Sequence, residues 1–167
     1  MTDEIPFCRP HRSVLFVPAD KPRAVSKAAG LGADALILDL EDAVAEDAKT
    51  QAREQVCDAI ASWQDCGARR LLRLNPVTSN FFSADVKTAA DAKPDGVVIP
   101  KVSRAETLLK VRAALDAAGY EGPVWAMIET PTAILNLRLI GEVAVEARLE
   151  GLIAGTNDLA AALRCRL

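Results

Sequence analysis

The chain has 167 residues, half of them apolar, and its formal net charge is −3. This composition predicts a folded domain with its own core, and the lack of a basic block argues against a nucleic-acid partner. No apolar run approaches the roughly 18 residues that span a bilayer, so we expect no membrane partner.

Cysteine usage and the first residues bear on the compartment. The four cysteines form no C-x-x-C pair, which favours free thiols in a reducing compartment over a disulfide scaffold or a zinc site. The N-terminal sequence MTDEIPFCRPHR lacks the apolar segment of a signal peptide. We therefore expect a cytoplasmic protein.

Strands and helices are expected to alternate along the chain after an irregular lead-in at 1–12, so that 13–167 forms one domain. Short apolar runs predict strands at 13–18, 35–44, 69–75, 96–101, 124–129 and 149–155. Helix-forming segments predict helices from 22 to about 30–32, at 45–63, 85–92, 104–118 and 132–148, and from 158 to the end. This alternation favours parallel strands joined by helical crossovers.

Polar residues follow almost every predicted strand, and this decides between two parallel architectures. A doubly wound sheet places its ligand site at one switch point, whereas a (β/α)8 TIM barrel collects polar residues at the ends of most strands. The residues concerned are Asp39, Glu41, Asp42, Arg73, Asn75, Lys101, Glu129 and Asp158. We therefore predict an α/β fold of the (β/α)8 TIM-barrel type, with about six β/α units in this chain.

Two carboxylates at matching places on successive strands suggest a metal site. Glu129 closes the apolar run VWAMI, and Asp158 follows GLIAG after a short turn. Burying a charge is costly unless it is paired or binds a metal, so the pair favours Mg²⁺, with water and substrate oxygens as the other ligands. The alternative is that one or both carboxylates cap the next helix.

Six motifs, in order, resemble those of the HpcH/HpaI aldolase and citrate lyase β-subunit (CitE-like) family. They are RSVLFVPADKPR, ALILDLEDAV, LLRLN, GVVIPKV, MIET and GTNDLA. The ending GTNDLAAALR is similar to that of the CoA-ester lyase branch, and the resemblance covers about residues 12–167. It implies a barrel, usually a homo-oligomer, that makes or breaks a carbon–carbon bond in acyl thioesters such as citryl-CoA or malyl-CoA.

The resemblance also implies roles for particular residues. Glu129 and Asp158 match the Mg²⁺ ligands, Glu129 also lying at the substrate, and Arg73 matches the arginine that holds the substrate carboxylate. The acidic cluster, defined as Asp39, Glu41 and Asp42, matches a motif that lines the metal pocket. Lys21 and Arg23 lie where basic residues of relatives meet the CoA phosphates. Relatives continue through two more strands and a helical segment, so we expect either a truncated gene product or fragment, or an open sheet that closes by association.

The chemistry can also be argued from the residues. An arginine fork suits a carboxylate, Mg²⁺ can act as a Lewis acid and template, and the acidic cluster is the candidate base for the hydroxyl proton. Glu41 and Asp42 are better suited to orienting water or Arg73. Arg73 could instead be a structural ion-pair partner of Asp39, and Lys101 is interpreted as structural rather than as a Schiff-base lysine.

We therefore predict a Mg²⁺-dependent carbon–carbon lyase or aldolase that acts on the CoA thioester of a hydroxy acid. Two alternatives stay open. One is an aldolase for free keto-acids such as pyruvate, which would not bind CoA. The other is a truncated, non-catalytic remnant of the family.

Overall fold

The computed structural model describes residues 11–166. The lead-in predicted for 1–12 therefore lies outside the described residues, apart from His11 and Arg12. Strands are β1 (Val14–Pro18), β2 (Ala35–Asp39), β3 (Arg69–Arg73), β4 (Gly96–Ile99), β5 (Val124–Ile128) and β6 (Leu149–Ala154). Helices are α1 (Pro22–Ala28), α2 (Lys49–Glu54), α3 (Val56–Ser62), α4 (Phe82–Ala92), α5 (Ala105–Ala117), α6 (Pro131–Leu135), α7 (Leu137–Glu142) and α8 (Thr156–Leu163), with a 3-10 turn η1 at Glu46–Ala48.

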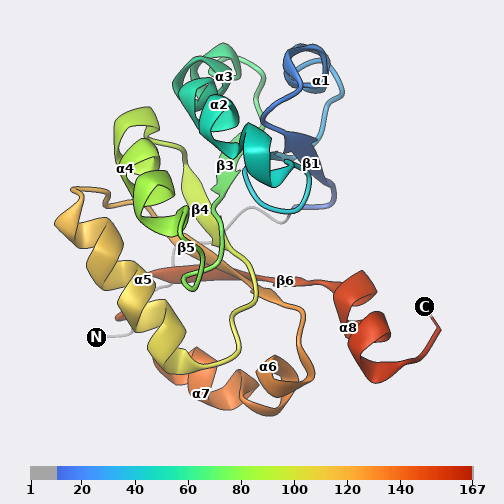
Figure 1. Ribbon diagram of the computed structural model, residues 1–167, viewed down its shortest axis with the longest axis vertical. Coiled ribbons are helices and arrows are strands. Elements are labelled where there is room, and N and C mark those ends of the chain that lie inside the picture. Colours follow the sequence, from blue (N-terminus) through green and yellow to red (C-terminus); the bar gives the residue numbers. More distant parts are fainter. Residues whose placement is uncertain (1–10, 167) are drawn as a thin grey trace.

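The strands form one six-stranded sheet in the order β1-β2-β3-β4-β5-β6, and every neighbouring pair is parallel. A doubly wound sheet would reverse its strand order at a switch point, and this sheet does not. Helices α1 to α7 follow one another in chain order around the outside of the sheet, while α8 projects beyond the end of β6 (Figure 1). The predicted α/β architecture is confirmed, in the form of a partial barrel with six strands.

Two apolar layers hold the sheet. Alternate side chains of a strand point to opposite faces, so Leu36 and Leu38 pack outward against the helices, in the main core cluster. Ile37, Leu71 and Val98 point inward and form a second, smaller cluster. None of the helices within residues 11–166 is long and apolar enough to span a lipid bilayer.

The second strand ends earlier than its apolar sequence predicts. We expected a strand at 35–44, but β2 ends at Asp39. The Asp39 carboxylate accepts hydrogen bonds from the backbone N–H groups of Glu41 at 2.8 Å and Ala43 at 3.3 Å. Such side-chain bonds stabilise a turn in place of the sheet ladder. The turn leads the chain off the sheet at the point where the acidic cluster begins.

The prediction of one continuous helix at 132–148 is wrong. The segment is divided into α6 and α7 at Asn136, and α7 ends at Glu142. The Asn136 side chain donates to the Ser103 carbonyl at 2.9 Å, so a tertiary contact fixes the break. The helix predicted at 45–63 is likewise divided into η1, α2 and α3.

Candidate functional site

The parallel sheet brings the predicted site residues to one edge. Asp39 and Arg73 are the last residues of the neighbouring strands β2 and β3 and are paired in register. Glu129 directly follows β5, and Asp158 lies in the first turn of α8, which follows β6. The carboxyl ends of parallel strands meet at the same edge, so the convergence predicted from the sequence is present.

Arg73 is held by the acidic cluster. Its Nε donates to Asp39 Oδ1 at 2.7 Å and its Nη2 to Asp39 Oδ2 at 2.5 Å, which is a bidentate ion pair between two buried side chains. The structural pairing of Arg73 with Asp39, which the sequence left as an alternative, therefore exists. The remaining nitrogen, Nη1, points away from Asp39 and lies 3.0 Å from Glu41 Oε2 and 3.9 Å from Asp42 Oδ2.

Apolar side chains surround the Arg73 guanidinium on its other sides. Its Cζ lies 4.9 Å from the centroid of the Phe16 ring, and Nη1 lies 3.6 Å from Met127 Sδ. Burial alone would lower the pKa of Arg73, but the hydrogen bonds and charges of Asp39 outweigh it and raise that pKa. The site therefore presents a permanent, fixed positive charge.

Lys101 connects this arginine cluster to Glu129. Its Nζ donates to Glu41 Oε1 at 2.6 Å, and its backbone N–H donates to Glu129 Oε1 at 2.6 Å. The hydrogen bond from Nζ to Glu41 raises the pKa of Lys101. A Schiff-base lysine needs a lowered pKa, so the geometry supports a structural role.

Glu129 is buried, and one of its carboxylate oxygens has no hydrogen-bond partner among the described residues. Within residues 11–166, its Oε2 has no hydrogen-bond partner and is inaccessible to solvent. Burial raises the pKa of Glu129, and the nearby charges of Asp158 and Glu41 raise it further. A Cβ on Gly155 would lie 2.7 Å from this oxygen and 2.4 Å from Glu129 Cβ. The glycine therefore lets β6 pass directly beside the carboxylate.

Neither carboxylate is the N-cap of its helix. Thr130 caps α6, because its Oγ1 accepts a hydrogen bond from the Ala133 N–H at 3.1 Å. Gly155 is the N-cap of α8, and Asp158 lies exposed in the first turn. Asp158 lines a pocket of about 300 Å³ together with Arg73, Asp42, Phe16, Met127 and the β6–α8 residues 153–157.

This donor set fits Mg²⁺ with Glu129 and Asp158 as its protein ligands. The observation that carries the fit is the buried, unpartnered Oε2 of Glu129, since an unpaired buried carboxylate oxygen is costly without a cation. Mg²⁺ usually takes one or two carboxylates and completes its shell with water and substrate. The described part of the chain has no cluster of three or more His, Cys, Asp or Glu side chains able to hold a metal.

Lys21 and Arg23 are exposed at the start of α1, which follows β1 at the same end of the sheet. Lys21 Nζ lies 2.7 Å from Asp20 Oδ2. Pro22 occupies the first turn of α1, where its missing N–H is not needed. The two basic side chains are thus near the pocket end of the sheet but outside the set of residues that line the pocket.

A buried polar network behind the acidic cluster escaped the sequence reasoning. Asp85, fully buried on α4, accepts from Arg53 Nε at 2.9 Å and from Asn75 Nδ2 at 2.7 Å. Asn75 also donates to the Leu40 carbonyl at 3.0 Å. Arg53 is therefore part of this network rather than of a solvated helix face. The signal was an aspartate one helical turn before Ala89, on the apolar face of α4.

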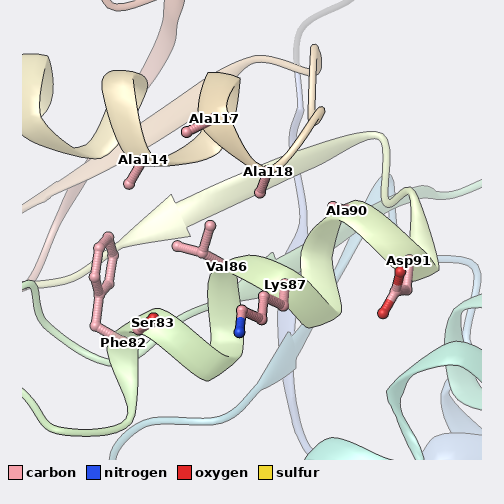
Figure 2. Close-up of a pocket in the computed structure, with 9 residues that line it drawn as sticks. All are labelled: Phe82, Ser83, Val86, Lys87, Ala90, Asp91, Ala114, Ala117 and Ala118. Carbon is pink, nitrogen blue, oxygen red and sulfur yellow. The ribbon is translucent and has the colours of Figure 1, made fainter.

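A second pocket, of about 460 Å³, lies between helices α4 and α5 on the outside of the sheet. Figure 2 shows Phe82 and Val86 facing Ala114, Ala117 and Ala118 across it. None of the predicted site residues lines this groove. The chemistry of the described residues is therefore concentrated at the strand ends.

Comparisons with known proteins identify the family of the chain. The model of the HpcH/HpaI aldolase/citrate lyase family matches residues 12–166. A (3S)-malyl-CoA thioesterase of Cereibacter sphaeroides is 45% identical over 158 residues, which are 94% of this chain and 53% of the relative. An L-malyl-CoA/beta-methylmalyl-CoA lyase of the same species is 35% identical over 169 residues, covering 95% of this chain and 52% of the relative.

Solved structures give the same result. The protein CitE from Mycobacterium tuberculosis, in complex with magnesium, acetoacetate and coenzyme A, is 28% identical with a TM-score of 0.75, covering 96% of this chain and 54% of that one. The citrate lyase beta subunit complexed with oxaloacetate and magnesium, from the same organism, is 30% identical with a TM-score of 0.74, covering 92% and 62%. The chain spans about half the length of the curated relatives it matches. It belongs to the HpcH/HpaI aldolase/citrate lyase family.

Proposed function

We propose that this site acts, with Mg²⁺, on the CoA thioester of a hydroxy acid of the malyl class and breaks the carbon–carbon bond beside the hydroxyl group. The observation that carries the proposal is the buried, unpartnered Glu129 Oε2 at the same strand ends as Arg73. Together they provide a place for a cation next to a place for a carboxylate. The relatives that act on malyl-CoA support the substrate class.

The residues of the chain would bind and orient the hydroxy-acid end. Glu129 and Asp158 would hold Mg²⁺, which supplies Lewis-acid polarisation and a template for substrate oxygens. Asp39 occupies the bidentate face of Arg73, and Arg73 lines the pocket, so the substrate carboxylate would meet its Nη1 end. Phe16 and Met127 limit water around that contact, and this strengthens it.

Carbon–carbon cleavage needs an acceptor for the hydroxyl proton. Asp39 and Glu41 are occupied by Arg73 and Lys101, whereas Asp42 is exposed and lines the pocket. We assign the proton to Asp42. The hydroxyl carbon becomes the carbonyl of a keto-acid, the carbon–carbon bond breaks, and its electron pair moves to the carbon beside the thioester. That carbon then takes up a proton, so malyl-CoA would give glyoxylate and acetyl-CoA.

Hydrolysis of the thioester is the second candidate, and a specific observation favours it. The relatives that are 45% identical are named thioesterases, whereas the lyases are 35% identical. The same bound substrate would then lose its thiol to water, and malyl-CoA would give malate and CoA. Because the two reactions have different products, one assay separates them.

The experiment is turnover of malyl-CoA and citryl-CoA by the 167-residue chain, with Mg²⁺ and with a chelator. Keto-acid and acetyl-CoA identify cleavage, whereas hydroxy-acid and free CoA identify hydrolysis. Retention on immobilised CoA separates both from a keto-acid aldolase that does not use CoA, and it tests Lys21 and Arg23 as phosphate contacts. Absence of turnover with retained Mg²⁺ binding favours the non-catalytic alternative.

Metal binding tests the site independently of turnover. Glu129→Ala and Asp158→Ala are each expected to abolish Mg²⁺ binding in a calorimetric titration. The matched control is Glu142→Ala, which removes an exposed carboxylate paired with Arg138 on α7. Unchanged affinity in both site variants would refute the assignment.

A further inference from the structure

Lys101 has a backbone conformation that calls for an explanation. Its φ is 55°, in the left-handed region that non-glycine residues seldom adopt. Lys93, Arg148 and Arg164 share this conformation. Lys93 and Arg164 are the C-caps of α4 and α8, where it is common, and Arg148 directly precedes strand β6. Lys101 instead follows strand β4. Such a conformation persists when the surrounding contacts hold it, and it gathers at functional sites.

The contacts that hold Lys101 reach both halves of the proposed site. Its backbone N–H donates to Glu129 Oε1 and its Nζ donates to Glu41 Oε1, each at 2.6 Å. The other oxygen of Glu41 lies 3.0 Å from Arg73 Nη1. The left-handed turn makes both contacts possible from one residue. A continuous series of bonds therefore runs from Glu129 through Lys101 and Glu41 to Arg73.

These bonds decide which atoms remain available for ligands. Because Oε1 of Glu129 is bound by the Lys101 amide, Oε2 is the oxygen left without a partner. Because Glu41 shares its two oxygens between Lys101 and Arg73, it holds Nη1 in one place. The Lys101 side chain is 46% exposed, so it can be replaced without opening the core.

We infer that Lys101 is a positioning residue that couples the metal-binding carboxylate Glu129 to the substrate-binding Arg73. The inference rests on the proposed function, since it names what aligns the two halves of that site. Lys101 acts through Glu41 and through its own backbone, and it needs no contact with substrate. Removing the ammonium group releases the turn, so that Glu129 and Arg73 both lose their alignment.

The test compares Lys101→Met, Lys101→Arg and Lys101→Gly in the full chain, with calorimetric titration of Mg²⁺ as the first readout. Lys101→Met is expected to weaken Mg²⁺ binding by about 10- to 100-fold, as loss of a partner behind a metal ligand does. Lys101→Arg keeps the charge and is expected to restore most of the affinity. Lys101→Gly accommodates the positive φ but lacks the ammonium group, so it should bind Mg²⁺ as weakly as Lys101→Met.

Lys93→Met is the matched control. Lys93 has a φ of 48°, is exposed, and lies at the end of α4 away from the strand ends. The Lys93→Met variant should leave Mg²⁺ affinity unchanged.

Glu41→Gln provides a second test. Because Lys101 acts through Glu41, the double variant Glu41→Gln/Lys101→Met should bind Mg²⁺ no more weakly than the weaker-binding single variant. Additive losses would overturn the inference.

The outcomes separate the inference from the function on which it rests. Wild-type chain that fails to bind Mg²⁺ overturns the proposed function and the inference together. Wild-type binding with unchanged affinity in Lys101→Met overturns the inference alone. Equal losses in Lys93→Met and Lys101→Met also overturn it. Weaker binding in Lys101→Met and Lys101→Gly, restored in Lys101→Arg, supports it.

Discussion

Two arginines on the same strand bind carboxylates in nearly the same way, yet they make different environments. Arg69 and Arg73 are the first and last residues of β3, and because alternate residues share a face, both point inward. Arg69 donates to Glu150 through Nη1 at 2.7 Å and Nη2 at 2.5 Å. Arg73 also binds Asp39 in a bidentate manner, but through Nε and Nη2. One pair lies at each end of the partial barrel.

The Arg69 end is closed by aromatic side chains. The Trp125 ring centroid lies 5.7 Å from Arg69 Cζ, and its Nε1 donates to Glu150 Oε2 at 3.0 Å. The His11 ring packs edge-on against Trp125 with centroids 5.2 Å apart. The Arg73 end opens instead into the pocket beside Asp158. The Arg69–Glu150 pair is thus a structural contact, because aromatic side chains pack against it. The Arg73–Asp39 pair is part of the candidate site, because it faces the pocket.

The carboxylates at the two ends also differ in pKa. Burial raises the pKa of Glu41 and of Glu129, against the opposing hydrogen bonds from Lys101. Asp95, just before β4 at the Arg69 end, is also partly buried, but its hydrogen bonds with Arg70 outweigh burial and lower its pKa. Carboxylates whose pKa is raised, so that their charged form is disfavoured, are frequent at functional sites. The two ends therefore differ: Glu41 and Glu129 have raised pKa values, whereas Asp95 has a lowered one.

The largest expected effect is that of Asp39→Asn. Removing one partner of a fully buried ion pair is expected to lower the free energy of unfolding by about 3–5 kcal/mol, because the buried Arg73 loses the carboxylate that binds its Nε and Nη2. Urea denaturation measures the loss, and Glu142→Gln on the exposed α7 pair should change it by less than about 0.5 kcal/mol. A loss as small as that of the control would show that Asp39 does not carry the Arg73 pair.

Glu150→Gln at the other end should cost less and leave the site intact. The pair is partly exposed, with side-chain exposures of 22% for Arg69 and 27% for Glu150, so we expect a loss of about 1–3 kcal/mol. The amide keeps an oxygen that can accept from Trp125. Mg²⁺ affinity, measured by titration at a temperature where both proteins are folded, should be unchanged. A fall in that affinity would show that the Arg69–Glu150 pair and the proposed Mg²⁺ site are not independent.

Glu129→Gln should have the smallest effect and the opposite sign. The pKa of Glu129 is raised on folding, so the stability it contributes is present below the ordinary glutamate pKa of 4.5 and is lost as pH rises through the folded-state value. Without Mg²⁺ the variant should therefore be more stable than wild type at pH 7 by about 1 kcal/mol, and the gain should vanish in acid. Thermal melting across this pH range measures it. Added Mg²⁺ should reverse the order.

The sequence predicted which residues gather at the site because that outcome depends on topology alone. Parallel strands with polar residues after them place those residues at one edge, whatever the loops do. It left the pairing within the site open, with the Arg73–Asp39 ion pair as one alternative. It could not predict that the turn after β2 directs Glu41 toward both Arg73 and Lys101.

The errors lie where tertiary contacts override local preference. The helix break at Asn136 depends on the Ser103 carbonyl from a distant loop, which helix propensity does not register. The apolar sequence after Asp39 continues to favour a strand, but the side chain of Asp39 itself satisfies the backbone and ends it. The Lys101 conformation likewise follows from partners on other strands. For Asn136 and Lys101 the determining residue lies outside the local window, whereas Asp39 ends its strand through local side-chain bonds.

The pairing of β5 with β6 contains an irregularity with a consequence for how this strand can evolve. Val124 pairs with Leu149 but Trp125 pairs with Gly151, so Glu150 is an extra residue in the ladder. A one-residue shift reverses which face every later side chain occupies. Gly151 packs beneath Trp125 and Gly155 beneath Glu129 only in this phase. The strand should therefore tolerate exchange of residue types far better than any change in its length, and a single-codon deletion near 150 would disrupt both ends of the barrel at once.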